Sequence, residues 1–175
     1  MRRASHRAMA WLVAALAAGA MTAVVPAAVS AQQLVYLVRH AERADGGSMS
    51  AAAETDPLLS EVGKAAADRL AAMLAESGIT AIFATEYRRT QDTGRPLASR
   101  LGLTVQTNPA RDIAGLVARL RADHANGIVL VIGHSNSVPG VIKALGGPEL
   151  TMADDEYGTL FVFVSATGAL SRIRF

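Results

Sequence analysis

Three short segments of the 175-residue chain place arginine or histidine at or soon after the end of an apolar run. Arginine presents a planar fork of hydrogen-bond donors that fits an anion, and histidine changes its charge near neutral pH. These residue types therefore suit a site that binds a small anion and carries out chemistry on it. The residues concerned are Arg39, His40 and Arg43 after the apolar run LVYLV, Arg89 within TEYRRTQDT, and His134 after IVLVIG.

Apolar runs rich in β-branched residues alternate with longer segments of helical period, and together they must position these side chains. The predicted strands cover residues 34–38, 81–85, 103–107, 128–133, 159–164 and 169–175. The predicted helices cover residues 60–76, 87–101, 113–125 and 138–145. This order predicts a three-layer αβα sandwich with a mostly parallel central sheet and a C-terminal hairpin.

The binding crevice of an open parallel sheet lies beyond the carboxyl ends of its strands. His40 and His134 each follow a predicted strand, so parallel strands would bring them to the same edge of the sheet. Thr85 ends another strand and opens TEYRRTQDT at that edge. A functional role for His40 is favoured, because a solvated strand end does not require arginine on both sides. His124 lies in the last turn of a predicted helix, where the helix dipole favours a cation, and fits a structural role.

Three motifs in sequence order resemble the histidine phosphatase superfamily, which has the phosphoglycerate-mutase-like fold. The resemblance covers nearly the whole chain after residue 31 and is strongest to the compact phosphohistidine-phosphatase type. The short segments between the motifs lack the insertions of the mutases, which favours hydrolysis over the mutase reaction. The motifs are Arg39-His40 at the end of the first strand, Thr85-x-x-x-Arg89-x-x-x-Thr93 at a helix start, and Gly133-His134-Ser135-Asn136 after a late strand.

The resemblance implies a metal-independent phosphatase that acts on phosphomonoesters or phosphoramidates and needs no cofactor. His40 would be the nucleophile and would form a phosphohistidine that water then hydrolyses. Arg39, Arg43 and Arg89 would hold the phosphate. His134 would donate a hydrogen bond to the phosphate from the opposite side.

The roles of three residues depend on their positions in the folded protein. Asp112 lies where many family members place an acidic proton donor, but it fits equally well as the N-cap of the following helix. Ala41 stands where the family usually has glycine, and alanine would be strained there if the position required a positive φ. Arg89 is preferred to Arg88 as a phosphate ligand, because its spacing from Thr85 fits the motif.

Two other classes of function use the same residues. A non-catalytic, extracytoplasmic protein that binds phosphate-bearing ligands would keep the arginines without needing a nucleophile. A metal site could combine His40, His134 and a carboxylate such as Asp112, but three nearby arginines would repel a divalent cation. The sequence specifies neither the oligomeric state nor the substrate, which we expect to be a small phosphorylated compound or a phosphoprotein.

The first 31 residues have the features of a secretory signal peptide. Three arginines precede a long apolar run, and the small residues Val29-Ser30-Ala31 suit cleavage after Ala31. The run approaches the ~20 apolar residues that span a bilayer, so an uncleaved N-terminal anchor is the alternative. We therefore expect an exported protein, periplasmic or extracellular, in which residues 32–175 form one histidine phosphatase domain without membrane association after cleavage.

Removal of this segment changes the charge of the protein. Three of the 17 basic residues lie within it, which leaves 14 basic against 15 acidic residues. No run rich in lysine and arginine remains, which disfavours nucleic acid as a partner. The chain has no cysteine, so cysteine-ligated metal sites are excluded. A loop rich in glycine, alanine and serine at residues 44–57 is predicted to select the substrate.

Overall fold

Ten strands and helices alternate along the part of the chain that the computed structural model describes, residues 33–46 and 56–175. The predicted signal peptide and most of the predicted loop at residues 44–57 lie outside these ranges. The elements in chain order are β1 (Leu34–Arg39), α1 (Glu61–Leu74), β2 (Ala81–Ala84), α2 (Arg88–Leu101), β3 (Val105–Thr107), α3 (Ile113–Asp123), β4 (Ile128–Gly133), α4 (Ser137–Ala144), β5 (Thr159–Val164) and β6 (Ala169–Arg174).

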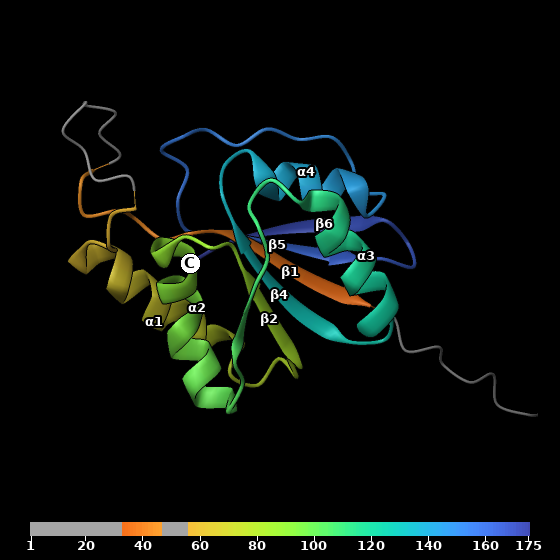
Figure 1. The fold of residues 1–175 in the computed structure, drawn as a ribbon, viewed down its shortest axis with the longest axis horizontal. Helices are drawn as coiled ribbons and strands as arrows, with labels where there is room; N and C mark the ends of the chain where they lie inside the picture. The colour runs from red at the N-terminus through yellow and green to blue at the C-terminus, as the bar shows by residue number, and fades with distance from the viewer. Residues whose placement is uncertain (1–32, 47–55) are drawn as a thin grey trace, which may run out of the picture.

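Six strands form one mixed sheet in the order β3-β2-β4-β1-β5-β6 (Figure 1). The first four in that order are parallel to one another, while β5 is antiparallel to β1 and β6 is antiparallel to β5. The predicted α/β architecture with a mostly parallel sheet and a C-terminal hairpin is confirmed. Within the described residues, no helix is long and apolar enough to cross a bilayer.

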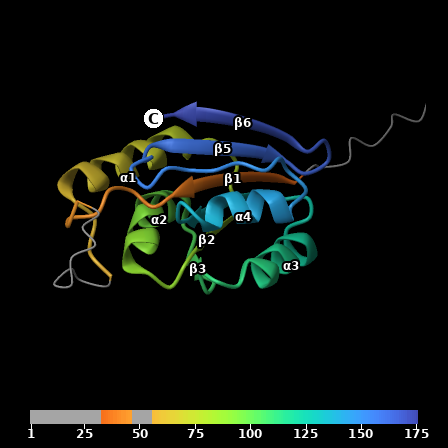
Figure 2. The same ribbon diagram turned by 90° about the horizontal axis from the view of Figure 1, so that it is seen from above.

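Side chains on the central strands alternate between two buried clusters, one on each face of the sheet. On β1, Val35 and Leu37 pack with residues of α3 and α4, whereas Val38 packs with residues of α1 and α2. β2 and β4 alternate in the same way, and Figure 2 shows the helices on either side of the sheet. Burial on both faces explains why LVYLV and IVLVIG read as continuous apolar runs rather than alternating ones.

The third strand is shorter than predicted, and the end of α2 gives the reason. Gly102 has a φ of 66° and ends the helix in the left-handed conformation that glycine adopts readily. The backbone N–H of Leu103 then donates to the carbonyl of Ala98 at 2.9 Å. Leu103 therefore belongs to the end of the helix, and β3 begins two residues later, at Val105.

Helix α1 begins directly against the segment that follows β1. Ser60 caps the helix, because its Oγ accepts a hydrogen bond from the backbone N–H of Gly63 at 2.9 Å. The Ser60 backbone N–H donates to the carbonyl oxygen of Glu42 at 3.0 Å. A Cβ atom on Gly63 would lie 2.2 Å from that same carbonyl oxygen. The absence of a side chain at position 63 therefore lets α1 approach the backbone two residues after His40.

We predict that Gly63→Ala destabilises the protein, although alanine is favoured over glycine inside a helix by about 1 kcal/mol. The overlap with a backbone carbonyl requires the helix or the Glu42 segment to move, at a cost of roughly 1–3 kcal/mol. Urea denaturation of wild type and variant measures the change. Ala65→Gly, at an exposed position of the same helix, reports the propensity effect alone. A Gly63→Ala variant as stable as wild type would contradict the close approach.

Candidate active site

The parallel pairing of β1 with β4 brings the two candidate histidines together. Arg39 is in register with Gly133, and the backbone N–H of His40 continues the ladder by donating to the Gly133 carbonyl at 2.9 Å. The His40 and His134 rings follow these strands, with their centroids 5.3 Å apart. Two segments far apart in sequence therefore form one edge, as the sequence predicted.

The His40 side chain is held in one tautomer. The residue is 3% exposed, and its Nδ1 lies 2.8 Å from the carbonyl oxygen of Ala41. A carbonyl only accepts hydrogen bonds, so Nδ1 carries the proton and Nε2 keeps its lone pair. Burial lowers the pKa of His40 to about 3, and the positive charges of Arg39 and Arg89 act in the same direction. At neutral pH the ring is therefore neutral, with Nε2 available as a nucleophile.

His134 is also neutral, and a chain of hydroxyl groups orients its ring. Burial lowers the pKa of His134 to about 4, with Arg89 as the next contribution. Its Nε2 lies 3.0 Å from Oγ1 of Thr85, which lies 2.8 Å from Oγ1 of Thr90. Thr90 Oγ1 donates to the carbonyl of Tyr87 at 2.7 Å, so the hydroxyl of Thr85 donates to Thr90 and accepts from His134. The proton of the neutral ring is therefore on Nε2.

Three arginines bring unsatisfied donors to this edge. The Nε atoms of Arg39, Arg43 and Arg89 are buried, and none has a hydrogen-bond partner among the described residues. They are the only buried side-chain nitrogen or oxygen atoms in that part of the chain without a partner. An unsatisfied buried donor costs roughly 1–3 kcal/mol, and such atoms are rare in folded proteins. An anion bound between these guanidinium groups would satisfy all three.

Arg39 is held by the loop between α4 and β5. Its Nη1 donates to the carbonyls of Ala153 at 3.2 Å and Asp154 at 2.6 Å. Its Nη2 donates to the hydroxyl of Tyr157 at 3.3 Å, and the guanidinium carbon lies 4.2 Å from the centre of that ring. Arg39 therefore has a fixed orientation in the protein before any anion binds.

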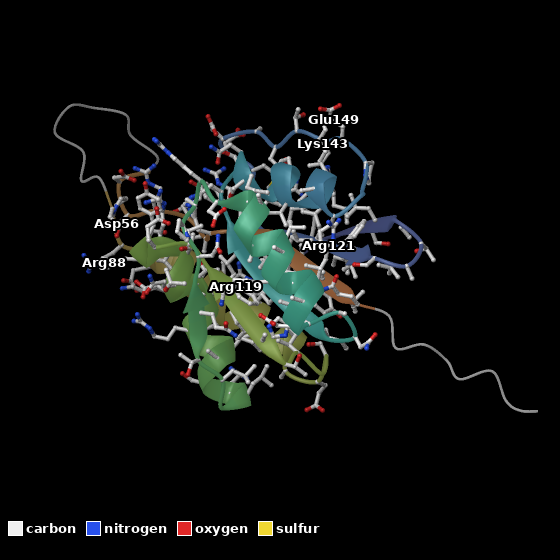
Figure 3. The ribbon with its side chains drawn as sticks, turned by 45° about the vertical axis from the view of Figure 1, so that its right-hand side comes forward. Asp56, Arg88, Arg119, Arg121, Lys143 and Glu149 are labelled. Atoms are coloured by element: carbon white, nitrogen blue, oxygen red, sulfur yellow. The ribbon has the colours of Figure 1, made fainter. Side chains whose placement is uncertain are left out.

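Asp56 organises the start of α2, a role that no sequence motif indicates beyond its place before Pro57. Both of its carboxylate oxygens accept from the backbone N–H of Arg88 at 3.0 Å, and Oδ1 lies 3.3 Å from Nη1 of Arg89. Figure 3 shows Asp56 beside Arg88. Tyr87, the N-cap position of this helix, makes no side-chain capping hydrogen bond. Asp56 therefore caps α2 from another segment and orients Arg89.

A cavity of about 660 Å³ connects these groups. Arg111 lines it as a fourth arginine, which sequence reasoning missed because no motif includes it. Its full lining consists of Arg39, His40, Arg43, Tyr87, Arg89, Ala110, Arg111, His134, Ser135, Asn136 and Asp154. Five of the six predicted site residues therefore meet in one cavity.

Asp112, the sixth, does not line this cavity. Its Oδ1 accepts from the backbone N–H of Gly115 at 2.8 Å, which makes it the N-cap of α3. The capping alternative is therefore the one that the structure supports, and Asp112 is not placed to donate a proton in this arrangement. Glu86, also near the edge, accepts from the backbone N–H of Ala110 at 2.7 Å.

Ala41 fits its position without strain. Every described residue with a positive φ is glycine, so Ala41 has an ordinary backbone conformation. Its N–H donates to Oγ1 of Thr93 at 2.9 Å, and that hydroxyl donates to the carbonyl of Arg89 at 2.7 Å. The strain that a positive φ would have caused at Ala41 is therefore absent, and Thr93 connects the backbone next to His40 with the backbone of Arg89.

No cluster of three or more His, Cys, Asp or Glu side chains that could hold a metal ion occurs in residues 33–46 and 56–175. The arginine-lined cavity instead suits an anion with several oxygens, such as a phosphoryl group, because guanidinium groups donate to such oxygens in pairs. A neutral histidine with a free Nε2 in the same cavity suits nucleophilic attack.

The sheet and its carboxyl edge define an α/β protein of the phosphoglycerate-mutase-like fold. A sequence model of the histidine phosphatase superfamily (branch 1) matches residues 35–114, from β1 into α3. Over these residues, which include Arg39, His40 and Arg89, the chain is similar to the histidine phosphatase superfamily.

One curated relative is the "Probable phosphoglycerate mutase GpmB" of Yersinia pestis (strain Pestoides F). It is 36% identical over 75 residues, which are 43% of this chain and 35% of that protein. The similarity therefore spans about a third of the relative's length.

Solved structures extend the likeness over more of the chain. A mycobacterial glucosyl-3-phosphoglycerate phosphatase in complex with VO3 aligns with a TM-score of 0.61 and 17% identity, over 81% of this chain and 98% of that one. The protein histidine phosphatase SixA, complexed with tungstate, aligns with a TM-score of 0.59 and 18% identity, over 80% and 94% of the two chains. Because the sequence identity is this low, the two comparisons show a shared fold and nothing more specific.

We predict that the free energy of unfolding falls as the pH drops from about 6.5 to about 4. The folded pKa values of about 3 for His40 and about 4 for His134 lie below the unfolded value, so the unfolded state binds more protons in this range. The contribution of the two neutral rings to the free energy of unfolding is therefore complete above the unfolded pKa. It is lost as the pH falls toward the folded pKa values. Denaturation at several pH values measures the slope.

His40→Ala should make that slope shallower, because one of the two buried rings is removed. Ring-nitrogen NMR of the wild type should show His40 neutral from about pH 5 to 8, with the proton on Nδ1. A charged His40 ring at pH 6, or an unchanged slope in the variant, would contradict the neutral buried pair.

Asp56→Ala is expected to destabilise the protein by about 1 kcal/mol through loss of the cap on α2. Asp56→Asn should keep most of this stability, because its amide oxygen still accepts from the Arg88 N–H. Thermal denaturation distinguishes the two. Asp92→Asn, which removes only the pair with Arg95 on the same helix, is the control. Equal losses in both Asp56 variants would show that the contact to Arg89, rather than the cap, dominates.

Proposed function

We propose that this protein is a metal-independent phosphatase that works through a phosphohistidine intermediate on His40. One observation carries the proposal: a neutral histidine with a free Nε2 shares a cavity with three buried arginine Nε–H groups that lack partners among the described residues. A phosphoryl group is the ligand whose charge, oxygen number and reactivity match both features.

The reaction has two displacements at phosphorus. Nε2 of His40 forms a bond to phosphorus as the bond to the leaving oxygen or nitrogen breaks, and the leaving group takes up a proton from water in the open cavity; the attacking water of the second step returns one proton to solvent. Water then attacks phosphorus, the Nε2–P bond breaks, and inorganic phosphate is released with His40 neutral again. The hydrogen bond from Nδ1 to Ala41 keeps the ring oriented in both steps.

Binding of the phosphoryl group falls to the surrounding cations. Arg39, Arg43 and Arg89 donate through the Nε atoms, and their other nitrogens remain in contact with protein groups such as Asp56 and the Asp154 carbonyl. These donors are in place before the reaction, which is the condition for strong transition-state stabilisation. A bound dianion also favours protonation of His134, which would then donate to a phosphate oxygen.

A phosphate-binding protein without turnover is the alternative, because it needs the same arginines. The relatives act on different compounds, a phosphoglycerate, a glucosyl-phosphoglycerate and a phosphorylated protein histidine by their names, so a small phosphorylated compound and a phosphoprotein both fit the proposal. Export, and with it a periplasmic or extracellular location, remains a prediction from residues 1–31.

We predict that the wild type hydrolyses phosphomonoesters such as p-nitrophenyl phosphate in EDTA and that His40→Ala abolishes the activity. Incubation with labelled substrate and rapid quenching at alkaline pH should trap an acid-labile phosphoenzyme in the wild type only. His124→Ala, a substitution of a histidine that packs on Phe83 away from the cavity, should retain both properties.

Calorimetry with inorganic phosphate separates the alternatives. Phosphate binding without turnover by the wild type would favour the binding protein. Turnover retained by a folded His40→Ala variant would contradict the proposed nucleophile.

A further inference from the structure

The candidate cavity has one negatively charged side chain among its described lining residues. Four arginines line it, Arg39, Arg43, Arg89 and Arg111, together with the acidic residue Asp154. A carboxylate in this position repels a phosphate dianion and so weakens the binding of the phosphoryl group alone. Its presence needs an explanation beyond phosphate binding.

Asp154 is attached to both candidate catalytic segments. Its backbone carbonyl accepts from Nη1 of Arg39 at 2.6 Å, and its Oδ1 accepts from the hydroxyl of Ser135 at 2.8 Å. Ser135 directly follows His134, so this hydrogen bond ties the carboxylate to the segment that carries His134. Serine donates one hydrogen bond and leaves the negative charge of the carboxylate in place.

The Asp154 carboxylate is not the counterion of any arginine in the described chain. Of the other three arginines that line the cavity, Arg43 pairs with Asp45 and Arg89 pairs with Asp56, and no ion pair joins Arg111 to Asp154 among the described residues. Asp154 forms no ion pair among the described residues, although arginines line the same cavity, and its side chain is exposed toward it. The carboxylate therefore keeps an open position for a cation from outside the protein.

The two acidic residues that follow Asp154 behave differently. Glu156 accepts from the hydroxyl of Thr159 at 3.0 Å, and neither Asp155 nor Glu156 lines the cavity. The acidic run Asp154-Asp155-Glu156, which sequence reasoning treats as a solvated loop, therefore contributes one residue to the candidate site.

We propose that Asp154 forms a subsite for a positively charged group on the leaving side of the substrate, and that the substrate is a small phosphomonoester of an amino alcohol. This inference rests on the proposed function, because it names a substrate class for the same cavity. A volume of about 660 Å³ holds a phosphoryl group together with a small leaving group. The arginines bind the phosphoryl oxygens, and Asp154 pairs with the ammonium group.

Three two-carbon phosphate esters of similar size test the inference, because they differ in the charge of the leaving group. That group is positive in phosphoethanolamine, neutral in ethylene glycol monophosphate and negative in phosphoglycolate. We expect kcat/KM to fall in that order for the wild type. Exposed ion pairs are worth up to about 1 kcal/mol, so phosphoethanolamine should exceed the neutral ester by roughly threefold to fivefold. The preference should shrink at high salt.

Asp154→Asn should remove this preference and raise the relative activity on phosphoglycolate, while it keeps the contact with Ser135. Asp155→Asn makes the same change of charge one residue further on, outside the cavity, and should leave the order unchanged. A preference that is the same in both variants and the wild type would overturn the inference, as would a wild type that prefers phosphoglycolate.

Dissociation constants for the three esters, measured by calorimetry on all variants, separate this inference from the proposed function. Binding in the expected order without turnover would contradict the hydrolysis and support the subsite. No binding of any ester would contradict both. If Asp154→Asn slows all three esters equally and spares p-nitrophenyl phosphate, Asp154 donates a proton to the leaving group, which overturns the subsite.

Discussion

The pairing of β1 with β4 is the constraint on which the rest of the site depends. Its register sets Arg39 opposite Gly133, and the ladder extends one residue further through the backbone N–H of His40. A slip of one residue would turn every side chain of β1 to the opposite face of the sheet, where it would meet the wrong packing partners. Burial on both faces makes such a slip costly, so core packing fixes the position of the nucleophile more firmly than any contact within the cavity does.

The same rigidity explains how the protein keeps cations around a buried imidazole. Burial lowers the pKa of His40 and keeps the ring neutral, and the positive charges of Arg39 and Arg89 add to this effect. Arg89 itself has a lowered pKa because it is buried and close to Arg43. This arrangement is unfavourable for folding, since like charges and unsatisfied donors lie close together. An anion that relieves both effects therefore stabilises the folded state as it binds.

Sequence reasoning predicted the elements of the fold and the residues that follow strands, because hydrophobic runs and strand order are local and repetitive signals. It could not decide the role of Asp112, since a helix cap and a proton donor occupy the same kind of loop position. Asp56, Arg111 and Asp154 were missed for a related reason. Their significance comes from contacts across the fold, such as Asp56 with the first turn of α2, and no spacing along the chain encodes those contacts.

The close approach of α1 to the Glu42 carbonyl ties helix stability to catalytic geometry. Position 63 lies on a helix where alanine would ordinarily be the better residue, yet any side chain there would displace the backbone two residues from His40. Selection for a sturdier helix and selection for a well-placed nucleophile therefore act in opposite directions at this one position. Thermal robustness in this protein has to be gained elsewhere, on surfaces of α1 and α2 that face away from the carboxyl edge of the sheet.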